Sequence, residues 1–162
     1  MNGDNTPENP GKAARPISEE EVRALITDWF NAVHNGAPAE YQQQLFAPGV
    51  KVEAWTGAAF DIPRHIALHQ DLADEVHRIR SLRLTPVEGD PARTQALGEV
   101  EWEATVKNRA TEPRRIRSLV EEEWIVERGP DGQPRFARYF SCAIRYLPGS
   151  ATLDLPPQGE RG

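Results

Sequence analysis

Hydrophobic residues near the start of the chain recur every three or four positions, a spacing that predicts an amphipathic helix. The residues that follow this spacing are Val22, Leu25, Ile26, Trp29, Phe30 and Val33. Ser18 and Glu21 have the spacing of a capping box at the start of the helix. Gly36 can adopt the left-handed backbone conformation that commonly ends a helix. A first helix is therefore expected from Ser18 to about residue 34.

Two short elements are predicted to follow. Residues 38–46 should form a second helix that buries Tyr41, Leu45 and Phe46. Residues 50–55 alternate between apolar and polar side chains, which is typical of a strand with one buried face. The chain therefore begins with two helices and a strand.

A third helix is predicted from Asp61, which suits the N-cap position, to about Glu75. At 100° per residue, His65 and His69 fall inside its apolar stripe, and His77 would lie at the margin. A buried imidazole must find hydrogen-bond partners or a ligand. His65 and His69 are therefore either satisfied core residues or the lining of a site in which they transfer a proton or bind a ligand.

A metal ion held by both histidines is a third possibility, because histidines at i and i+4 can share one ion. However, the stretch HIALH lacks the glutamate of the HEXXH motif, and the sequence marks no third ligand. The single cysteine, Cys142, excludes zinc sites built on several cysteines. We therefore predict no metal site.

From residue 78 onward the hydrophobic period changes to two, which predicts strands. One strand should end near residue 87, and three longer strands should span about 95–108, 114–127 and 135–147. The GPDG sequence at 129–132 is a strong turn signal between the last two. Helices followed by a run of antiparallel strands indicate an α+β fold.

Glutamates on two of these strands are expected to differ in environment. On the strand at 114–127, alternation places Glu122 and Trp124 on the same face, which should be the inner one. Burial there would raise the pKa of Glu122 and suit it to act as a general acid or base. The alternative is a strand that is shifted by one residue or an exposed edge. The three glutamates of Glu99–Glu103 are expected to face solvent.

The four tryptophans are the remaining candidates for a site, as flat surfaces against which an apolar ligand packs. They are Trp29, Trp55, Trp102 and Trp124. Large aromatic residues more often fill a protein core, so a purely structural role stays open for each of them.

Composition narrows the function further. A chain of 162 residues is expected to form one domain. A net charge of −6 gives no attraction for phosphate backbones, so we expect no nucleic-acid partner. The sequence has no glycine-rich phosphate loop or dinucleotide motif, so we expect no organic cofactor. No long apolar run or secretory signal is evident, and we expect a cytoplasmic protein without a membrane span.

The two ends of the chain are polar and rich in proline and glycine, which is typical of segments that do not fold. We expect a disordered N-terminal tail at 1–17 and a flexible C-terminal tail at 148–162. The folded domain is then predicted to be 18–147.

The order of these elements resembles the nuclear-transport-factor-2-like superfamily, and in particular its SnoaL-like branch. The segments that carry the resemblance are the HNG at the end of the first helix, QQLFAPGVKVEAW, and EEEWIVERGPDGQPRFARYFS. The resemblance covers 18–147. It implies a curved antiparallel sheet wrapped around the N-terminal helices, forming a cone with a pocket. It also implies a homodimer, which we expect to form through the outer sheet face with Leu119 and Ile125.

The resemblance does not extend to the chemistry of ketosteroid isomerases. Those enzymes place a base carboxylate after the first strand, a tyrosine on the first helix and a second acid on the strand before last. The matching positions here are Ala54, Trp29 and Glu122. Two of the three roles are missing.

The function expected from the sequence is the binding of a small, largely apolar organic molecule. An enzyme of this kind would carry out cofactor-free acid–base chemistry of the isomerase, cyclase, dehydratase or hydrolase type. His65 or His69 would move a proton, and Glu122 would orient the ligand or donate one. The alternative is a non-catalytic ligand-binding or dimerisation module of the same fold, since one fold hosts many functions.

Overall fold

The computed structural model of the protein describes residues 15–155. Its helices are Glu19–His34 (α1), Ala39–Gln44 (α2) and Ile62–Gln70 (α3). Its short strands are Val52–Glu53 (β1) and Ala59–Phe60 (β2). Its long strands are Leu72–Val87 (β3), Asp90–Val106 (β4), Arg115–Arg128 (β5) and Pro134–Tyr146 (β6). The predicted α+β class is confirmed, and the elements follow the predicted order apart from β2, which was not predicted.

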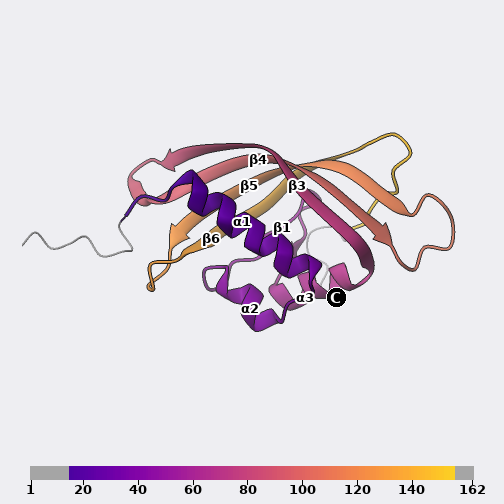
Figure 1. Cartoon of the computed structure of the whole chain (residues 1–162), viewed down its shortest axis with the longest axis horizontal. Helices are drawn as coiled ribbons and strands as arrows, with labels where there is room; N and C mark the ends of the chain where they lie inside the picture. The colour runs from indigo at the N-terminus through magenta and orange to yellow at the C-terminus, as the bar shows by residue number, and fades with distance from the viewer. Residues whose placement is uncertain (1–14, 156–162) are drawn as a thin grey trace, which may run out of the picture.

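The strands form one sheet in the order β2-β1-β6-β5-β4-β3. The four long strands are antiparallel to one another, as predicted. The pairing of β1 with β6, in which Val52 lies opposite Tyr139, is parallel, so the sheet is mixed at this edge. The sheet is curved, and α1 runs along its concave side (Figure 1).

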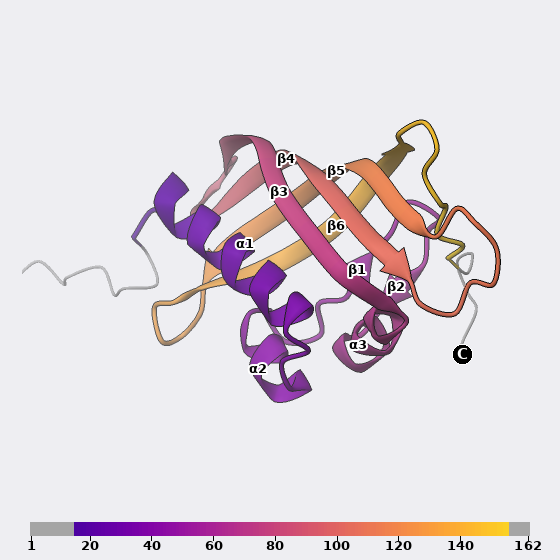
Figure 2. The same ribbon diagram turned by 45° about the vertical axis from the view of Figure 1, so that its right-hand side comes forward.

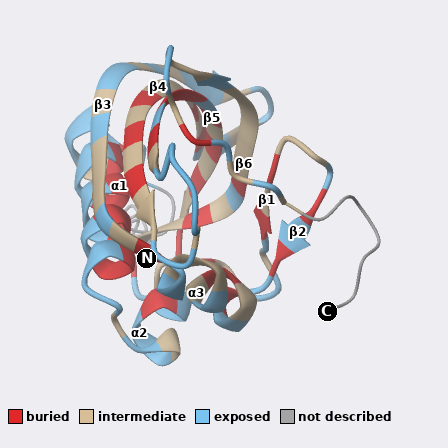
Figure 3. Ribbon diagram, turned by 90° about the vertical axis from the view of Figure 1, so that its right-hand side faces the viewer, coloured by how far each residue is buried: buried red, intermediate tan, exposed pale blue. Residues whose placement is uncertain are grey.

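Register shifts account for much of this curvature, because an extra residue on one strand bends it. They interrupt the β3–β4 pairing between Ala73 and Val76, and the β5–β6 pairing between Glu121 and Glu122. Viewed from the end, the sheet arches over its buried residues while α2 and α3 lie below (Figure 3). A turned view shows α3 beneath the end of β3 near β1 and β2 (Figure 2). This is the predicted cone.

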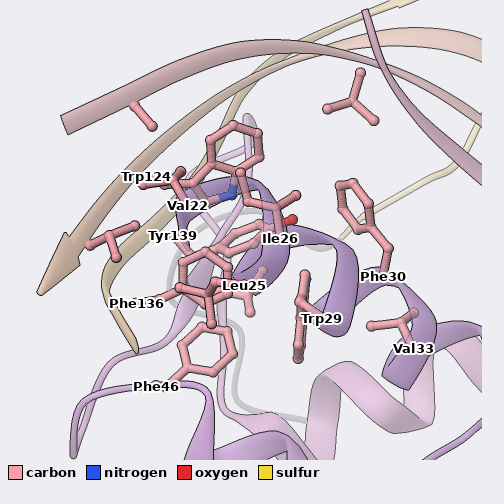
Figure 4. Close-up of a cluster of buried hydrophobic side chains, with 14 of the residues drawn as sticks. Val22, Leu25, Ile26, Trp29, Phe30, Val33, Phe46, Trp124, Phe136 and Tyr139 are labelled. Carbon is pink, nitrogen blue, oxygen red and sulfur yellow. The ribbon is translucent and has the colours of Figure 1, made fainter. Parts of the chain in front are cut away.

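Helix α1 is fixed at its start by the predicted capping box, in which Glu21 N donates to Ser18 Oγ and Ser18 N donates to Glu21 Oε2. Glu21 also accepts a hydrogen bond of 2.8 Å from the buried Arg128 guanidinium. The apolar face of α1 packs on Phe46, which follows α2, and on Phe136 and Tyr139 of β6 (Figure 4). Trp29, for example, lies edge-on to Phe46, with ring centroids 4.9 Å apart. This packing holds one end of the cone closed.

The first correction to the predicted elements concerns α2. Tyr41 is 46% exposed rather than buried, and Gln42 is buried in its place. Gln42 Nε2 donates to the carbonyl oxygen of Ala37, which offsets part of the cost of burying its amide. The strand predicted at 50–55 is also shorter, since only Val52–Glu53 pairs.

The second correction concerns α3, which ends at Gln70 and not near Glu75. The chain turns at Asp71 and enters β3, where Leu72 pairs with Val106 of β4. His77 is therefore a strand residue. Pairing with β4 overrides the helical pattern, because helix propensity is a weak preference that tertiary contacts readily overcome.

The segments next to the described ends lie against the fold. Ile17 is part of the core, and Ala151 is 1% exposed. Ala151 N donates to the carbonyl of Arg115, and Leu153 N donates to the Tyr146 hydroxyl. The rest of the two predicted tails lies outside the described residues. None of the helices in the described part of the chain is long and apolar enough to cross a membrane.

Candidate functional site

A cavity of about 70 Å³ lies between α1, α3 and the concave face of the sheet. A single water needs about 10–15 Å³ on this scale, so the cavity has room for several waters or a small organic group. Its aromatic lining consists of Trp29, Trp55, Phe60, Trp102 and Tyr139. Its polar lining consists of His65, His69, His77, Glu122 and Ser141. No lysine or arginine of the described chain lines it.

Glu122 lies on the sheet side of the cavity, on the inward face of β5 as predicted. It is 6% exposed, and its Oε2 accepts a hydrogen bond of 2.8 Å from the Ser141 hydroxyl on β6. Burial raises the pKa of Glu122 from 4.5 to about 8, although the Ser141 hydrogen bond acts in the opposite direction. At neutral pH this carboxyl group is mainly protonated and can donate a proton or a hydrogen bond.

Tyr139 lies beside Glu122 on the same side. Burial raises the pKa of the Tyr139 hydroxyl well above its ordinary value, and the charge of an ionised Glu122 would raise it further. The phenol therefore stays protonated. Glu122, Tyr139 and Ser141 together form what we call the sheet wall, which is uncharged at neutral pH.

His65 and His69 lie on the opposite side of the cavity, one turn apart on α3. Asp61 caps this helix by accepting a hydrogen bond from Arg64 N. The Nε2 atoms of the two imidazoles are 3.1 Å apart, which is hydrogen-bonding distance. Burial, and then the neighbouring His69 and His77, lowers the pKa of His65 well below its usual value. His65 is therefore neutral at physiological pH.

Glu75 supports this side of the cavity from behind His69 without lining the cavity, and sequence reasoning missed it. Its side chain is only 6% exposed. Its two carboxylate oxygens lie 2.8 and 2.9 Å from Nδ1 of His69, and Oε1 also accepts from Trp102 Nε1 at 3.1 Å. An ionised carboxylate can only accept hydrogen bonds. When Glu75 is ionised, His69 therefore carries a proton on Nδ1.

A bulge at the start of β3 directs Glu75 inward. Between Ala73 and Val76 the strand has one residue more than β4 opposite it. The extra residue is accommodated at Asp74, which adopts a positive φ of 49°. Aspartate tolerates this conformation better than most residues. Asp74 is exposed, and Glu75 turns toward His69. Bulges near functional sites often reorient a side chain in this way.

His77 is the third imidazole on this side. It lies opposite Trp102 in the β3–β4 pairing, and its ring stacks on Phe30 with centroids 4.3 Å apart. Its Nδ1 is 2.6 Å from Nε2 of His34, an exposed residue in the last turn of α1. Burial, and then His34 and His69, lowers the pKa of His77 well below its usual value. His65, His69, Glu75 and His77 form what we call the histidine wall.

The structure brings most of the predicted site residues together. His65, His69 and Glu122 line one cavity with Trp29, Trp55 and Trp102. Trp124 does not line it. Its ring is fully buried, packs edge-on to Tyr139 and covers Gly98. Trp124 shares its face with Glu122 but lies two residues nearer the closed end of the cone, where core packing fills the interior.

The histidines do not form a complete metal site. No group of three or more histidine, cysteine, aspartate or glutamate side chains in residues 15–155 is arranged to hold a metal ion. Both ring nitrogens of His69 are taken by Glu75 and His65. The arrangement is suited to passing protons between hydrogen-bonded groups.

Comparison with solved structures identifies the fold. The chain is 22% identical over 82% of its length to an NTF2-like protein with a cystatin-like fold from Novosphingobium aromaticivorans, with 83% of that chain covered and a TM-score of 0.54. A candidate scytalone dehydratase from the same organism gives a TM-score of 0.63 at 12% identity, covering 88% and 94% of the two chains. A ketosteroid isomerase-like protein from Erwinia carotovora atroseptica gives 0.56 at 12% identity, covering 81% and 98%.

These similarities confirm that the chain has the NTF2-like fold, as the resemblance in the sequence implied. At such identities they concern the fold alone, and function must be argued from the site. No protein-family model matches the chain, and no curated protein matches it in sequence.

Proposed function

We propose that this protein binds a small, uncharged and largely apolar organic molecule in the cavity and catalyses a proton transfer in it without an organic cofactor. The observation that carries this proposal is the buried Glu122, whose pKa is raised to about 8 in a cavity otherwise lined mainly by aromatic and aliphatic groups. A protonated carboxyl in such a place donates to a ligand oxygen, while a neutral imidazole accepts a proton.

The lining indicates the class of ligand. Without lysine or arginine in it, the described part of the cavity offers no permanently charged partner to a carboxylate or phosphate. A carbonyl or hydroxyl oxygen would pair with Glu122, and the carbon framework would pack between Trp29 and Trp102. Reactions that fit are isomerisation, dehydration, cyclisation or hydration, in which Glu122 acts as the acid and the histidine wall, with His65 and His69, as the proton acceptor.

One observation favours the alternative of a non-catalytic binding or dimerisation module. Both ring nitrogens of His69 have partners within the protein, which is what a structural histidine requires. In this alternative, the cavity binds a ligand without transferring a proton, or it serves only to space the helices from the sheet.

Exchange of hydrogen for deuterium in 2-tetralone separates these functions. This uncharged, apolar ketone has acidic hydrogens next to its carbonyl group. The proposal predicts that the protein accelerates deuterium incorporation from heavy water, followed by proton NMR, and that Glu122→Gln slows it by about a hundredfold or more. A binding module would bind 2-tetralone, seen as shifts of the tryptophan indole signals, without accelerating exchange. Absence of both binding and exchange would contradict the proposal.

We also propose that the protein is a homodimer through its outer sheet face. Leu119 is only 8% exposed, so this face offers less apolar surface than the sequence suggested. It carries cross-strand ion pairs instead, such as Arg78 with Glu101 at 3.4 Å and Arg117 with Glu103 at 3.8 Å. Light scattering at micromolar concentration should show a dimer that Ile125→Arg dissociates, and a monomeric wild type would contradict this proposal.

A further inference from the structure

The pair formed by His34 and His77 differs from the pair formed by His65 and His69 in the hydrogen-bond partners of its ring nitrogens. Every ring nitrogen of His69 already has a partner, and Nδ1 of His65 is buried without one. His77 uses only Nδ1, in its bond to His34. No partner for its Nε2 is found among residues 15–155, and this nitrogen is not one of the fully buried polar atoms that lack a partner. Because His77 lines the cavity, Nε2 is the ring nitrogen that is left to meet a ligand there.

His34, the partner of His77, lies on the solvent side of the histidine wall. It lies at the exposed end of α1 and lines a groove on the protein surface together with Asn35, Gly36 and Lys107. The groove and the cavity share the side chains of His65 and His69, which separate them. The two imidazoles of His77 and His34, 2.6 Å apart, thus span the wall from the cavity to the surface.

We propose that His77 and His34 form a proton relay that connects the cavity with solvent. This inference rests on the proposed function, because it supplies a path for the proton that the ligand loses or gains. It goes further by assigning His77 as the group that meets the ligand and His34, which does not line the cavity, as a positioning and transfer group at the surface.

Each step of the relay is a balanced proton transfer. His77 starts with its proton on Nδ1 and a lone pair on Nε2, and His34 starts with a proton on Nδ1 and a lone pair on Nε2. A ligand proton binds Nε2 of His77 as the Nδ1 proton passes to Nε2 of His34. The Nδ1 proton of His34 then leaves to water. Reprotonation of the ligand reverses every step, so both rings return to their starting tautomers without rotating.

The surroundings of the two rings support this role. Stacking on Phe30 holds the plane of the His77 ring, while its edge remains available. Burial keeps the pKa of both His77 and His34 below its usual value, so both rings are neutral and able to accept at neutral pH. The interaction of His34 with Glu75 acts against burial and favours the transient positive charge on His34. A neutral acceptor with a nearby anion is suited to rapid proton transfer.

The relay is tested by deuterium incorporation into 2-tetralone and by substitution of His34. His34→Gln retains an amide that can hydrogen bond to His77 but cannot pass a proton. We expect it to slow incorporation about tenfold or more while the affinity for 2-tetralone stays within about twofold of wild type. Gln70→Ala, in the same groove, should leave the rate unchanged. His34→Ala should also be slow, and free imidazole should restore it, whereas pyrazole, which is similar in size but weakly basic, should not.

A measurement on the ligand-free protein tests the relay without the use of 2-tetralone. In ¹⁵N-labelled protein, His77 Nδ1 and His34 Nε2 should show scalar coupling across their hydrogen bond, with one nitrogen protonated and the other bare. Absence of this coupling overturns the relay whatever 2-tetralone does. Equal incorporation rates in wild type and His34→Gln also overturn it and leave the proposed function standing. Absence of incorporation in the wild type contradicts the proposed function and the relay together.

Discussion

The sheet wall and the histidine wall each contain a glutamate whose carboxyl group lies inside the protein, but the partners of the two carboxyl groups differ. Glu122 is 6% exposed and has one neutral donor, the Ser141 hydroxyl. The Glu75 side chain is also 6% exposed and has two N–H donors, from His69 and Trp102. Donors stabilise a carboxylate, and a lack of them favours the neutral acid. Glu122 is placed to donate a proton, whereas the carboxyl group of Glu75 is occupied in holding His69 and Trp102.

The largest expected effect is the contribution of Glu122 to the dependence of stability on pH. Its pKa is about 8 in the folded protein and near 4.5 without burial. Between these values the folded state holds a proton that the unfolded state has lost, so stability falls as pH rises. The slope is about 1.4 kcal/mol per pH unit, or about 4 to 5 kcal/mol over the whole window.

Glu122→Gln tests this dependence because glutamine does not titrate. Chemical denaturation from about pH 4 to about pH 9 should show the variant gaining stability relative to wild type across the window. Below about pH 4 the two curves should run parallel, because Glu122 is protonated in both states. A constant difference at all pH values would mean that Glu122 has an ordinary pKa and that the two walls do not differ as described.

The next effect is a difference in the free energy of unfolding between two glutamate-to-leucine substitutions, one in each wall. Glu75→Leu leaves the N–H groups of His69 and Trp102 buried without an acceptor, and should lower the free energy of unfolding by about 3 kcal/mol. Glu122→Leu removes a costly buried polar group and leaves only the Ser141 hydroxyl to find a new partner. It should change stability at neutral pH by about 1 kcal/mol or less. Urea denaturation of both variants checks the contrast, and equal losses would contradict it.

Glu122 of the sheet wall could be predicted from the sequence, as could His65 and His69 of the histidine wall, because the information that places them is local, whereas the sequence left the orientation of Tyr139 and Ser141 open. Alternation along β5 placed Glu122 inward, and the phase of α3 placed His65 and His69 toward the interior. The helical pattern was extended to Glu75, however, because the sequence from 71 to 75 does not show that a strand and a bulge begin there. A pattern of period two cannot reveal a residue inserted out of phase.

The contact between His34 and His77 was missed for a different reason. The two residues are 43 positions apart, and each looks unremarkable in its own element. Only the path of the curved sheet over the end of α1 brings them together. Trp124 shows the same limit, since its side of β5 was predicted correctly but its position along the cone was not. Contacts of this kind depend on tertiary geometry that local periodicity does not contain.

The smallest expected effect comes from a substitution that should disturb the sheet wall alone. Gly98 lies opposite Glu122 on β4, and a Cβ atom there would be 2.7 Å from the Trp124 ring and 3.1 Å from the carbonyl oxygen of Ser81. Gly98→Ala should therefore push Trp124 against Tyr139 and cost about 1 to 2 kcal/mol. NMR should show shifts in the signals of Tyr139 and Trp124. Shifts of equal size in His65 and His69 would show that the two walls are coupled.

The bulge at Asp74 makes part of this cavity depend on the number of residues in β3. Leu72 and His77 both face inward although they are five positions apart, which a regular strand does not allow. Loss of one codon at Asp74 would restore regular alternation and leave both residues on the same face. The positive φ of Asp74, and not alternation alone, therefore sets how β3 presents the Glu75 carboxylate to His69.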